Sequence, residues 1–192
     1  EPMQVAALGR AAMEGLRRGG VVAIVKHMPG HGRAVVDSHL ELPRVTVDAE
    51  ALETDIEPFA SLNDAPMAMT CHLVFDAWDA ERPATLSPTV IGEIIRKRIG
   101  FDGLLMTDDI DMKALTGTAG EKASRALAAG CDVVLDCWAR MDEMVEISGL
   151  LGDATPECVA RLERAMATVA AGPQQRDMAE LLAIRDELLA LA

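Results

Sequence analysis

The sequence of 192 residues is half apolar and 26% charged, which suits a single globular domain with a substantial hydrophobic core. Its 18 basic and 31 acidic residues give a formal net charge of −13, which repels nucleic acids and anionic membrane surfaces, so we expect neither as a partner. No apolar run approaches the length of a membrane span. The four cysteines form no C-x-x-C pair, which favours reduced, buried thiols in a cytoplasmic protein.

The first half of the sequence alternates helical and strand patterns. Apolar residues recur at helical spacing over residues 3–18, where a pair of glycines ends the helix. Residues 21–25, VVAIV, are a β-branched run typical of a strand that is buried on both faces. A helix over residues 48–62, kinked or bounded by Pro58, and a strand within residues 65–75 repeat the pattern.

The second half continues this alternation. Ser87 and Pro88 predict the start of a helix that Gly100 ends. The segment GLLMTDD follows as a strand, then a helix over residues 119–129, and then the strand CDVVLDC. Strands that alternate with helices in this way predict parallel βα units. Three more helices are predicted over residues 141–151, 155–171 and 177–191.

Polar or titratable residues collect at the carboxyl end of each predicted strand. Active sites of (β/α)₈ barrels and of doubly wound sheets form at this end of the strands. A complete barrel takes about 250 residues. The pattern therefore predicts either an open α/β sheet or the carboxy-terminal piece of a barrel. The strand-end residues are Lys26 and His27, Cys71 and His72, Asp108 and Asp109, and Asp136.

The stretch KHMPGHGRAVVDSH, residues 26–39, contains three of the four histidines of the chain. Asp37 and His39 lie two residues apart, so in an extended segment the carboxylate can hold the imidazole in one tautomer and raise its basicity. Such a pair can transfer protons near neutral pH. The alternative is a surface loop whose polar side chains satisfy their own backbone.

Zinc binding by this loop is a weaker alternative. The proline and glycines of the loop exclude the helical i, i+4 histidine pair of zinc enzymes, and the spacing matches no familiar zinc-ligand pattern. We therefore expect no metal. The remaining possibility is a site on a folded loop, formed by His27, His31, Asp37 and His39.

The segment TDDIDM, residues 107–112, ends a predicted buried strand. A carboxylate at that place is a candidate nucleophile or general base. Asp108 and Asp109 point to opposite sides of a strand, so we expect at most one of them to share a pocket with His39. The alternative role of these carboxylates is to cap a helix or to face solvent.

Lys26 and His27 close another predicted strand and can donate hydrogen bonds to substrate hydroxyls; the alternative is a strand end exposed to water. His72 follows an apolar run and is more typical of a satisfied strand-end histidine than of a catalyst. One strand-end carboxylate together with a His–Asp pair on a loop suits a two-step displacement at a carbon centre.

Several blocks of the sequence resemble the signature of family 3 glycoside hydrolases, and in particular its β-N-acetylglucosaminidase branch, which trims peptidoglycan fragments. The resemblance covers roughly residues 1–140, and several blocks in register are far more specific than one short motif. Met28 stands where the family usually has Phe, a change that affects local packing only. The blocks are KHMPGHG, DSH, LP at residues 42–43, PATLSP, GFDGLLMTDDIDMKAL and AGCDVVL.

The resemblance implies a (β/α)₈ TIM barrel of which this chain supplies the last four βα units. Residues 1–192 would then be the carboxy-terminal half of one barrel domain, and we expect the amino-terminal half to be absent. By position in the motifs, Asp108 matches the nucleophile that forms a covalent glycosyl-enzyme, and His39 matches the acid/base with Asp37 as its partner. Lys26 and His27 match residues that bind sugar hydroxyls.

The activity implied by the resemblance is that of a retaining β-N-acetylhexosaminidase that removes N-acetylglucosamine from cytoplasmic muropeptides during peptidoglycan recycling. No cofactor is implied, and we expect a monomer. Some relatives are phosphorylases, so a phosphorylase that uses the same residues remains an alternative. A barrel that binds sugar without cleaving it is another alternative, although the intact set of Asp108, Asp37 and His39 disfavours it.

Overall fold

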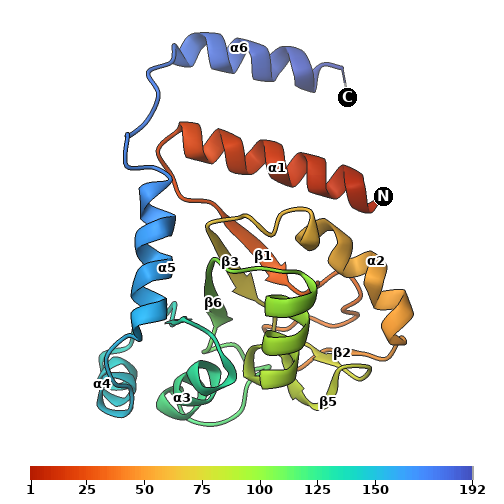
Figure 1. The fold of residues 1–192 in the computed structure, drawn as a ribbon, viewed down its shortest axis with the longest axis vertical. Helices are drawn as coiled ribbons and strands as arrows, with labels where there is room; N and C mark the ends of the chain where they lie inside the picture. Colours follow the sequence, from red (N-terminus) through yellow and green to blue (C-terminus); the bar gives the residue numbers. More distant parts are fainter. Residues whose placement is uncertain (192) are drawn as a thin grey trace.

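The computed structural model describes residues 1–191 (Figure 1). Four parallel strands form the main sheet in the order β1-β3-β6-β7, and helices lie between successive strands along the chain. This arrangement confirms the predicted parallel βα units. The strands of the main sheet are β1 (Ile24–Met28), β3 (Met67–Thr70), β6 (Leu104–Asp109) and β7 (Val133–Leu135). The helices are α1 (Pro2–Arg18), α2 (Ala49–Ala60), η1 (Ala84–Leu86), η2 (Val90–Arg98), α3 (Ala119–Ala129), α4 (Met141–Leu150), α5 (Pro156–Ala167) and α6 (Met178–Leu189).

Local signals in the sequence set the limits of several helices. Helix α3 begins after Thr118, whose side chain forms a capping box with Glu121, and it ends at Gly130, which has a φ of 114°. Helix η2 has π-type winding, and the Ser87 hydroxyl accepts a hydrogen bond from its first backbone N–H, that of Val90. These ends fall where the capping and breaking residues of the sequence predict them.

The predicted strand over residues 21–25 needs correction. The structure places β1 at residues 24–28, and Ile24 in this strand is 40% exposed. In the described part of the chain β1 lies at an edge of the sheet and pairs only with β3. Ile24 and Lys26 are both exposed, so β1 is not buried on both faces. A β-branched run can indicate a strand, but the number of its neighbours depends on the whole fold.

The predicted strand within residues 65–75 is in fact two strands of different sheets. After β3 the chain leaves the main sheet, and Val74 donates its backbone N–H to the carbonyl of Pro43. This contact belongs to a small second sheet in which β4 pairs in parallel with β2 and antiparallel with β5. The second sheet consists of β2 (Arg44–Val45), β4 (Val74–Phe75) and β5 (Asp79–Pro83).

The hydrophobic core lies where the main sheet packs against its helices. Ala68 in β3 and Leu105 in β6 are fully buried, as are Ile95 in η2 and Phe101 before β6. The two inner strands are therefore the most enclosed part of the fold. They form a rigid base for the side chains that follow them at the carboxyl edge of the sheet.

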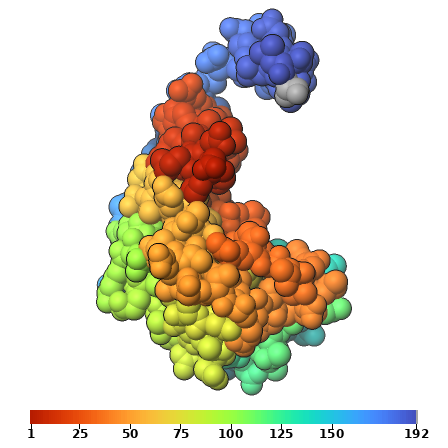
Figure 2. Space-filling model, turned by 90° about the vertical axis from the view of Figure 1, so that its right-hand side faces the viewer, coloured from red at the N-terminus to blue at the C-terminus, as the bar shows by residue number. Residues whose placement is uncertain are grey.

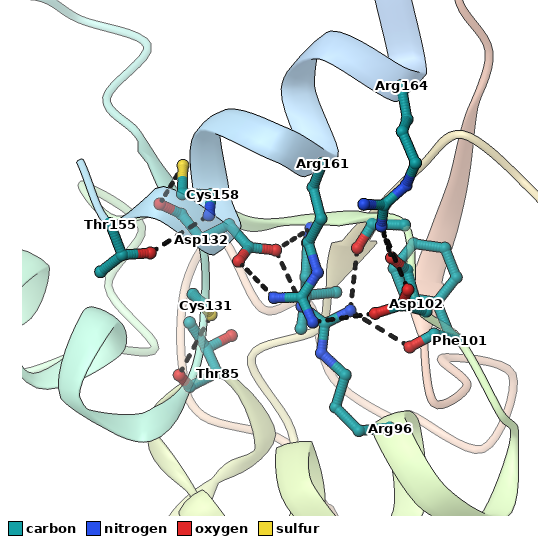
Figure 3. A network of polar contacts seen from close by, with 12 residues as sticks. Thr85, Arg96, Phe101, Asp102, Cys131, Asp132, Thr155, Cys158, Arg161 and Arg164 are labelled. Carbon is teal, nitrogen blue, oxygen red and sulfur yellow. Dashed lines mark hydrogen bonds and ion pairs between the residues drawn. The ribbon is translucent and has the colours of Figure 1, made fainter.

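The amino ends of β6 and β7 are fastened to α5 by an ion-pair network (Figure 3). Asp132, just before β7, accepts hydrogen bonds from Arg96 and Arg161, each at 2.8 Å. Arg161 also bonds Asp102, just before β6, at 3.0 Å. In parallel βα folds this end of the sheet serves stability, whereas the opposite end carries function.

Helix α6 stands apart from the rest of the structure. Figure 2 shows it projecting from the body of the molecule, and none of its residues is buried. Within residues 1–191, no helix combines the length and the apolar character that crossing a membrane requires.

Candidate active site

Asp108 and His27 meet at the carboxyl edge of the main sheet. The Oδ2 atom of Asp108, in β6, lies 3.6 Å from Nε2 of His27, in β1. Only 15% of the Asp108 side chain and 28% of the His27 side chain are exposed. Because β3 lies between β1 and β6, the two side chains approach each other across the carboxyl end of β3. The fold thus brings together a predicted catalytic and a predicted binding residue.

The neighbouring carboxylates Asp108 and Asp109 have different surroundings. Asp109 Oδ1 accepts backbone N–H bonds from Asp111 and Cys137, each at 3.1 Å, and so orders the loops after β6 and β7. Asp108 Oδ1 accepts the N–H of Asp109 at 2.9 Å, and its Oδ2 faces His27. Only one of the two acids therefore faces the candidate site, as the alternation of a strand predicts.

Burial dominates the electrostatics of His27. Removal from water lowers the pKa of His27 below the ordinary value of an imidazole, and the nearby Asp108 carboxylate opposes this shift without reversing it. A lowered pKa keeps the ring neutral at pH 7, with one nitrogen as a donor and the other as an acceptor. A neutral imidazole beside Asp108 can bind a hydroxyl group without neutralising the carboxylate.

Asp37 and His39 form the predicted dyad. Oδ1 of Asp37 lies 2.8 Å from Nδ1 of His39 and also accepts the backbone N–H of His39 at 2.9 Å. These contacts, the backbone bond first, lower the pKa of Asp37 and keep it ionised. An ionised Asp37 favours the His39 tautomer that carries its proton on Nδ1, so that Nε2 is free to exchange a proton with a substrate.

The dyad faces solvent in this structure. The side chain of His39 is 74% exposed and that of Asp37 is 57% exposed. Across residues 1–191, neither member of the dyad makes a hydrogen bond or ion pair with Asp108. The structure therefore forms the pair that the sequence predicts, but it does not place the pair against the strand-end carboxylate.

The loop between β1 and β2 connects the two groups. The rings of His27 and His31 meet edge to face with their centroids 5.5 Å apart. His31 Nε2 in turn lies 3.3 Å from the hydroxyl of Ser38, between the two dyad residues. An ion pair of 2.5 Å between Arg33 and Asp55 holds the loop against α2.

An open cavity lies beside β1. Its volume is about 610 Å³, and α1, α2 and the start of the loop complete its walls. The side chain of Lys26 is exposed there and forms no side-chain hydrogen bond or ion pair among residues 1–191. Lys26 and His27, the two predicted sugar-binding residues, thus both line space that a ligand can enter.

His72 stabilises the carboxyl end of β6 through hydrogen bonds. It is fully buried; its Nδ1 lies 2.8 Å from the Thr85 hydroxyl and its Nε2 2.9 Å from the carbonyl of Asp109. Burial lowers the pKa of His72, so the neutral ring donates from Nε2 to that carbonyl. This confirms the predicted satisfied strand-end histidine. Thr85 was not singled out from the sequence, because nothing local connects it to a histidine 13 residues earlier.

The loop histidines do not gather around a common point. Among residues 1–191, no group of three or more His, Cys, Asp or Glu side chains is arranged to hold a metal ion. His27 and His31 contact each other, while His39 turns toward Asp37 and solvent. The four residues of the alternative zinc site therefore do not converge in this structure.

Comparison with protein families identifies the chain. Residues 1–172 match the family described as glycosyl hydrolase family 3 N terminal domain. The chain belongs to glycoside hydrolase family 3. The match to this family confirms the resemblance found in the loop and strand-end motifs.

Curated relatives and solved structures agree with this assignment. The β-hexosaminidases of Chromobacterium violaceum and Bordetella avium are 40% and 38% identical, over 85% and 89% of this chain. NagZ from Neisseria gonorrhoeae, solved with N-trifluoroacetyl-D-glucosamine, has 33% identity and a TM-score of 0.75 over 89% of this chain and 52% of its own. A family 3 β-N-acetylglucosaminidase from Paenibacillus sp. has 31% identity and a TM-score of 0.76 over 90% of this chain and 36% of its own.

The matches cover only part of each relative. The aligned region is 47% of the Chromobacterium protein and 49% of the Bordetella protein, so the chain spans about half the length of the curated relatives it matches. The likeness therefore establishes the family and the α/β fold of these four units. The activity of a whole enzyme is a matter for proposal.

Proposed function

We propose that this protein acts as a retaining β-N-acetylhexosaminidase, with Asp108 as the nucleophile and His39, oriented by Asp37, as the acid and base. The observation that supports this most directly is the strand-end carboxylate of Asp108, poised beside His27, with the His–Asp dyad on the adjoining loop. The β-hexosaminidase relatives support the reaction class, and the solved β-N-acetylglucosaminidase from Paenibacillus sp. supports the choice of sugar. Lys26 and His27 would bind sugar hydroxyls.

The proposed reaction has two steps. The Asp108 carboxylate attacks the anomeric carbon while His39 gives its proton to the departing glycosidic oxygen, which leaves as an alcohol. His39, now neutral, takes a proton from water, and the resulting hydroxide displaces Asp108 from the sugar. A histidine in place of a second carboxylic acid avoids repulsion between two anions at one site.

The four βα units would be the last four of an eight-stranded TIM barrel. Their parallel order and the match to about half of each longer relative support this domain assignment. In such a barrel the carboxyl ends of all strands face one site, where Asp108 and His27 lie. Because His39 faces solvent in the structure, catalysis would require the loop to close over the sugar.

The natural substrate we propose is a peptidoglycan fragment that ends in N-acetylglucosamine, cleaved in the cytoplasm during recycling. The resemblance of the loop motifs to the branch that trims such fragments supports this choice. The free thiols of the structure, three of the four buried, are compatible with a reducing compartment.

A phosphorylase is the second candidate, because a histidine acid/base leaves room for an anionic acceptor that a carboxylate would repel. We expect an active preparation to release free N-acetylglucosamine from an aryl β-N-acetylglucosaminide at the same rate with and without 10-fold excess phosphate, measured by product chromatography. Formation of the 1-phosphate sugar in place of the free sugar would instead assign the phosphorylase activity.

The leaving group tests the role of His39. Replacing His39 by alanine is expected to lower kcat/KM about 10²- to 10⁴-fold for a natural glycoside, whose alcohol needs a proton to depart. For an activated aryl glycoside, whose phenolate departs unaided, the same substitution is expected to lower kcat/KM less than about tenfold. Equal losses on the two substrates would show that His39 is not the acid.

A further inference from the structure

Ser38 has an unusual place in the dyad loop. Over residues 30–42 it is the only residue that is buried, with 4% of its surface exposed, while Asp37 and His39 on either side face solvent. A buried hydroxyl needs a hydrogen-bond partner. That partner is the imidazole of His31, with 3.3 Å between His31 Nε2 and Ser38 Oγ.

The bonds around Ser38 make the dyad segment a compact unit. Asp37 Oδ1 binds both the backbone and the ring of His39, and the Asp37 carbonyl accepts the N–H groups of Leu40 and Glu41 at 2.9 and 3.1 Å. Any displacement of the His39 ring that keeps the dyad intact must therefore carry Ser38 with it. While His31 stays packed against His27, such a displacement must also change the contact between Ser38 and His31.

His31, in contrast, is held on the side of the strand-end carboxylate. Its ring packs against His27, whose Nε2 lies 3.6 Å from Asp108. The next residue, Gly32, has open space around the position of a Cβ atom, and beyond it Arg33 pairs with Asp55 of α2. One end of the loop is thus anchored, and the segment that carries His39 is attached to that anchor through Ser38.

We propose that the contact between His31 and Ser38 is a latch, which holds the Asp37–His39 dyad in the solvent-facing position of this structure. The latch opens when His39 swings toward a sugar bound at Asp108. Its catalytic consequence rests on the proposed function. His31 and Ser38 are positioning residues, because they act through the placement of His39 and touch no reacting atom.

The strength of the contact fits a bond that breaks in each turnover. A separation of 3.3 Å is at the long end of the hydrogen-bond range, and a single bond of this kind shifts an equilibrium about two- to tenfold. Such a bond biases the loop without locking it. A charged pair or a bidentate contact would hold the loop far more firmly.

Hydrogen exchange of the 192-residue chain tests the latch without any need for catalysis. In Ser38→Ala and in His31→Ala, the backbone amides of His39, Leu40 and Glu41 are expected to exchange about two- to tenfold faster. The double variant should exchange no faster than either single variant, because the same bond is lost. His31→Gln places an amide group where Nε2 lies and should restore slow exchange.

Two controls separate the latch from a general loosening of the loop. Val35→Ala changes a side chain that is 87% exposed in the same loop and should leave these exchange rates unchanged. The four histidines give a small set of imidazole NMR signals, of which that of buried His72 should stay in place while that of His31 moves. Unchanged exchange in Ser38→Ala, or additive effects in the double variant, would overturn the latch.

Kinetics test the link to catalysis. In an active preparation, Ser38→Ala is expected to raise kcat/KM about two- to tenfold for a poor leaving group and to leave it unchanged for an activated aryl glycoside, because only the former needs His39. An equal change for both substrates, or a decrease for the poor one, would contradict this link. If the protein cleaved neither substrate, the proposed function would fail, whereas the exchange experiment would still decide whether the latch exists.

Discussion

Replacing Asp108 by asparagine is expected to lower kcat/KM by about 10⁴-fold or more, because the amide cannot form the covalent bond to the anomeric carbon. The substitution keeps the size of the side chain and an oxygen to accept the N–H of Asp109, so the fold should remain intact. The release of a chromophore from an aryl β-N-acetylglucosaminide measures the loss. A denaturation midpoint equal to that of the parent would show that the loss is chemical.

The adjacent residue supplies a matched control. Asp109→Asn retains an oxygen for the N–H groups of Asp111 and Cys137 and should keep activity to within about tenfold. A fluorinated N-acetylglucosaminide that keeps its 2-acetamido group and slows hydrolysis of the intermediate should add its sugar mass to the peptide that contains both residues, and the adduct should be lost in Asp108→Asn only. Comparable losses of activity in the two variants would place the nucleophile elsewhere.

The order of helices and strands could be predicted because the residues that begin and end each element are close to it in the sequence. The helix over residues 119–129 has a capping residue before it and a glycine after it, and the structure has the same bounds. Pairing between distant segments leaves no such signal. The small second sheet joins residues 44–45 to residues 74–75, and the exposure of Ile24 depends on which strands lie beside it. These features follow from the assembled fold, and a single window of sequence does not contain them.

In the candidate site, too, contacts between residues close in sequence could be predicted, whereas contacts between distant segments could not be predicted from spacing. Asp37 and His39 are two residues apart, so their pairing could be predicted from spacing alone, and the structure forms it at 2.8 Å. The contact between Asp108 and His27 joins strands that are separated by about 80 residues of sequence. Their common strand-end position predicted the same edge of the sheet for both, and the motif resemblance assigned both to one sugar site. The burial of Ser38 and its contact with His31 could not be predicted, because a serine between two polar residues is typical of an exposed loop position.

The convergence of His39 on Asp108 remains a prediction, and the geometry of the loop shows what it requires. His39 lies at the exposed side of its segment, and a series of contacts through Ser38, His31 and His27 connects that segment to Asp108. A segment that is linked to the anchored end of its loop by one long hydrogen bond can exchange between positions rapidly enough to serve each turnover. In this proposal, the movement of the dyad and its exposure both follow from the same local packing.

At the opposite end of the sheet, Asp132→Ala is expected to lower the free energy of unfolding by about 3–5 kcal/mol, the cost of breaking a buried ion pair. Only 6% of the Asp132 side chain is exposed, and it accepts bonds from Arg96, Arg161 and the backbone of Leu105, each at 2.8 Å. Burial already lowers the pKa of Arg96, and Asp132 opposes that shift. Without Asp132, the Arg96 guanidinium would be a largely buried cation with no carboxylate partner.

Asp102 provides the comparison that tests this reasoning, because it pairs with Arg161 and Arg164 at 3.0 and 3.1 Å but its side chain is 77% exposed. Water screens such a pair, so Asp102→Ala should cost less than about 1 kcal/mol in the same urea unfolding experiment. The two variants remove one aspartate each from the same network (Figure 3) and differ chiefly in burial. Equal losses would mean that burial does not set the strength of this network, and equally small losses would mean that α5 is held to the sheet mainly by apolar packing.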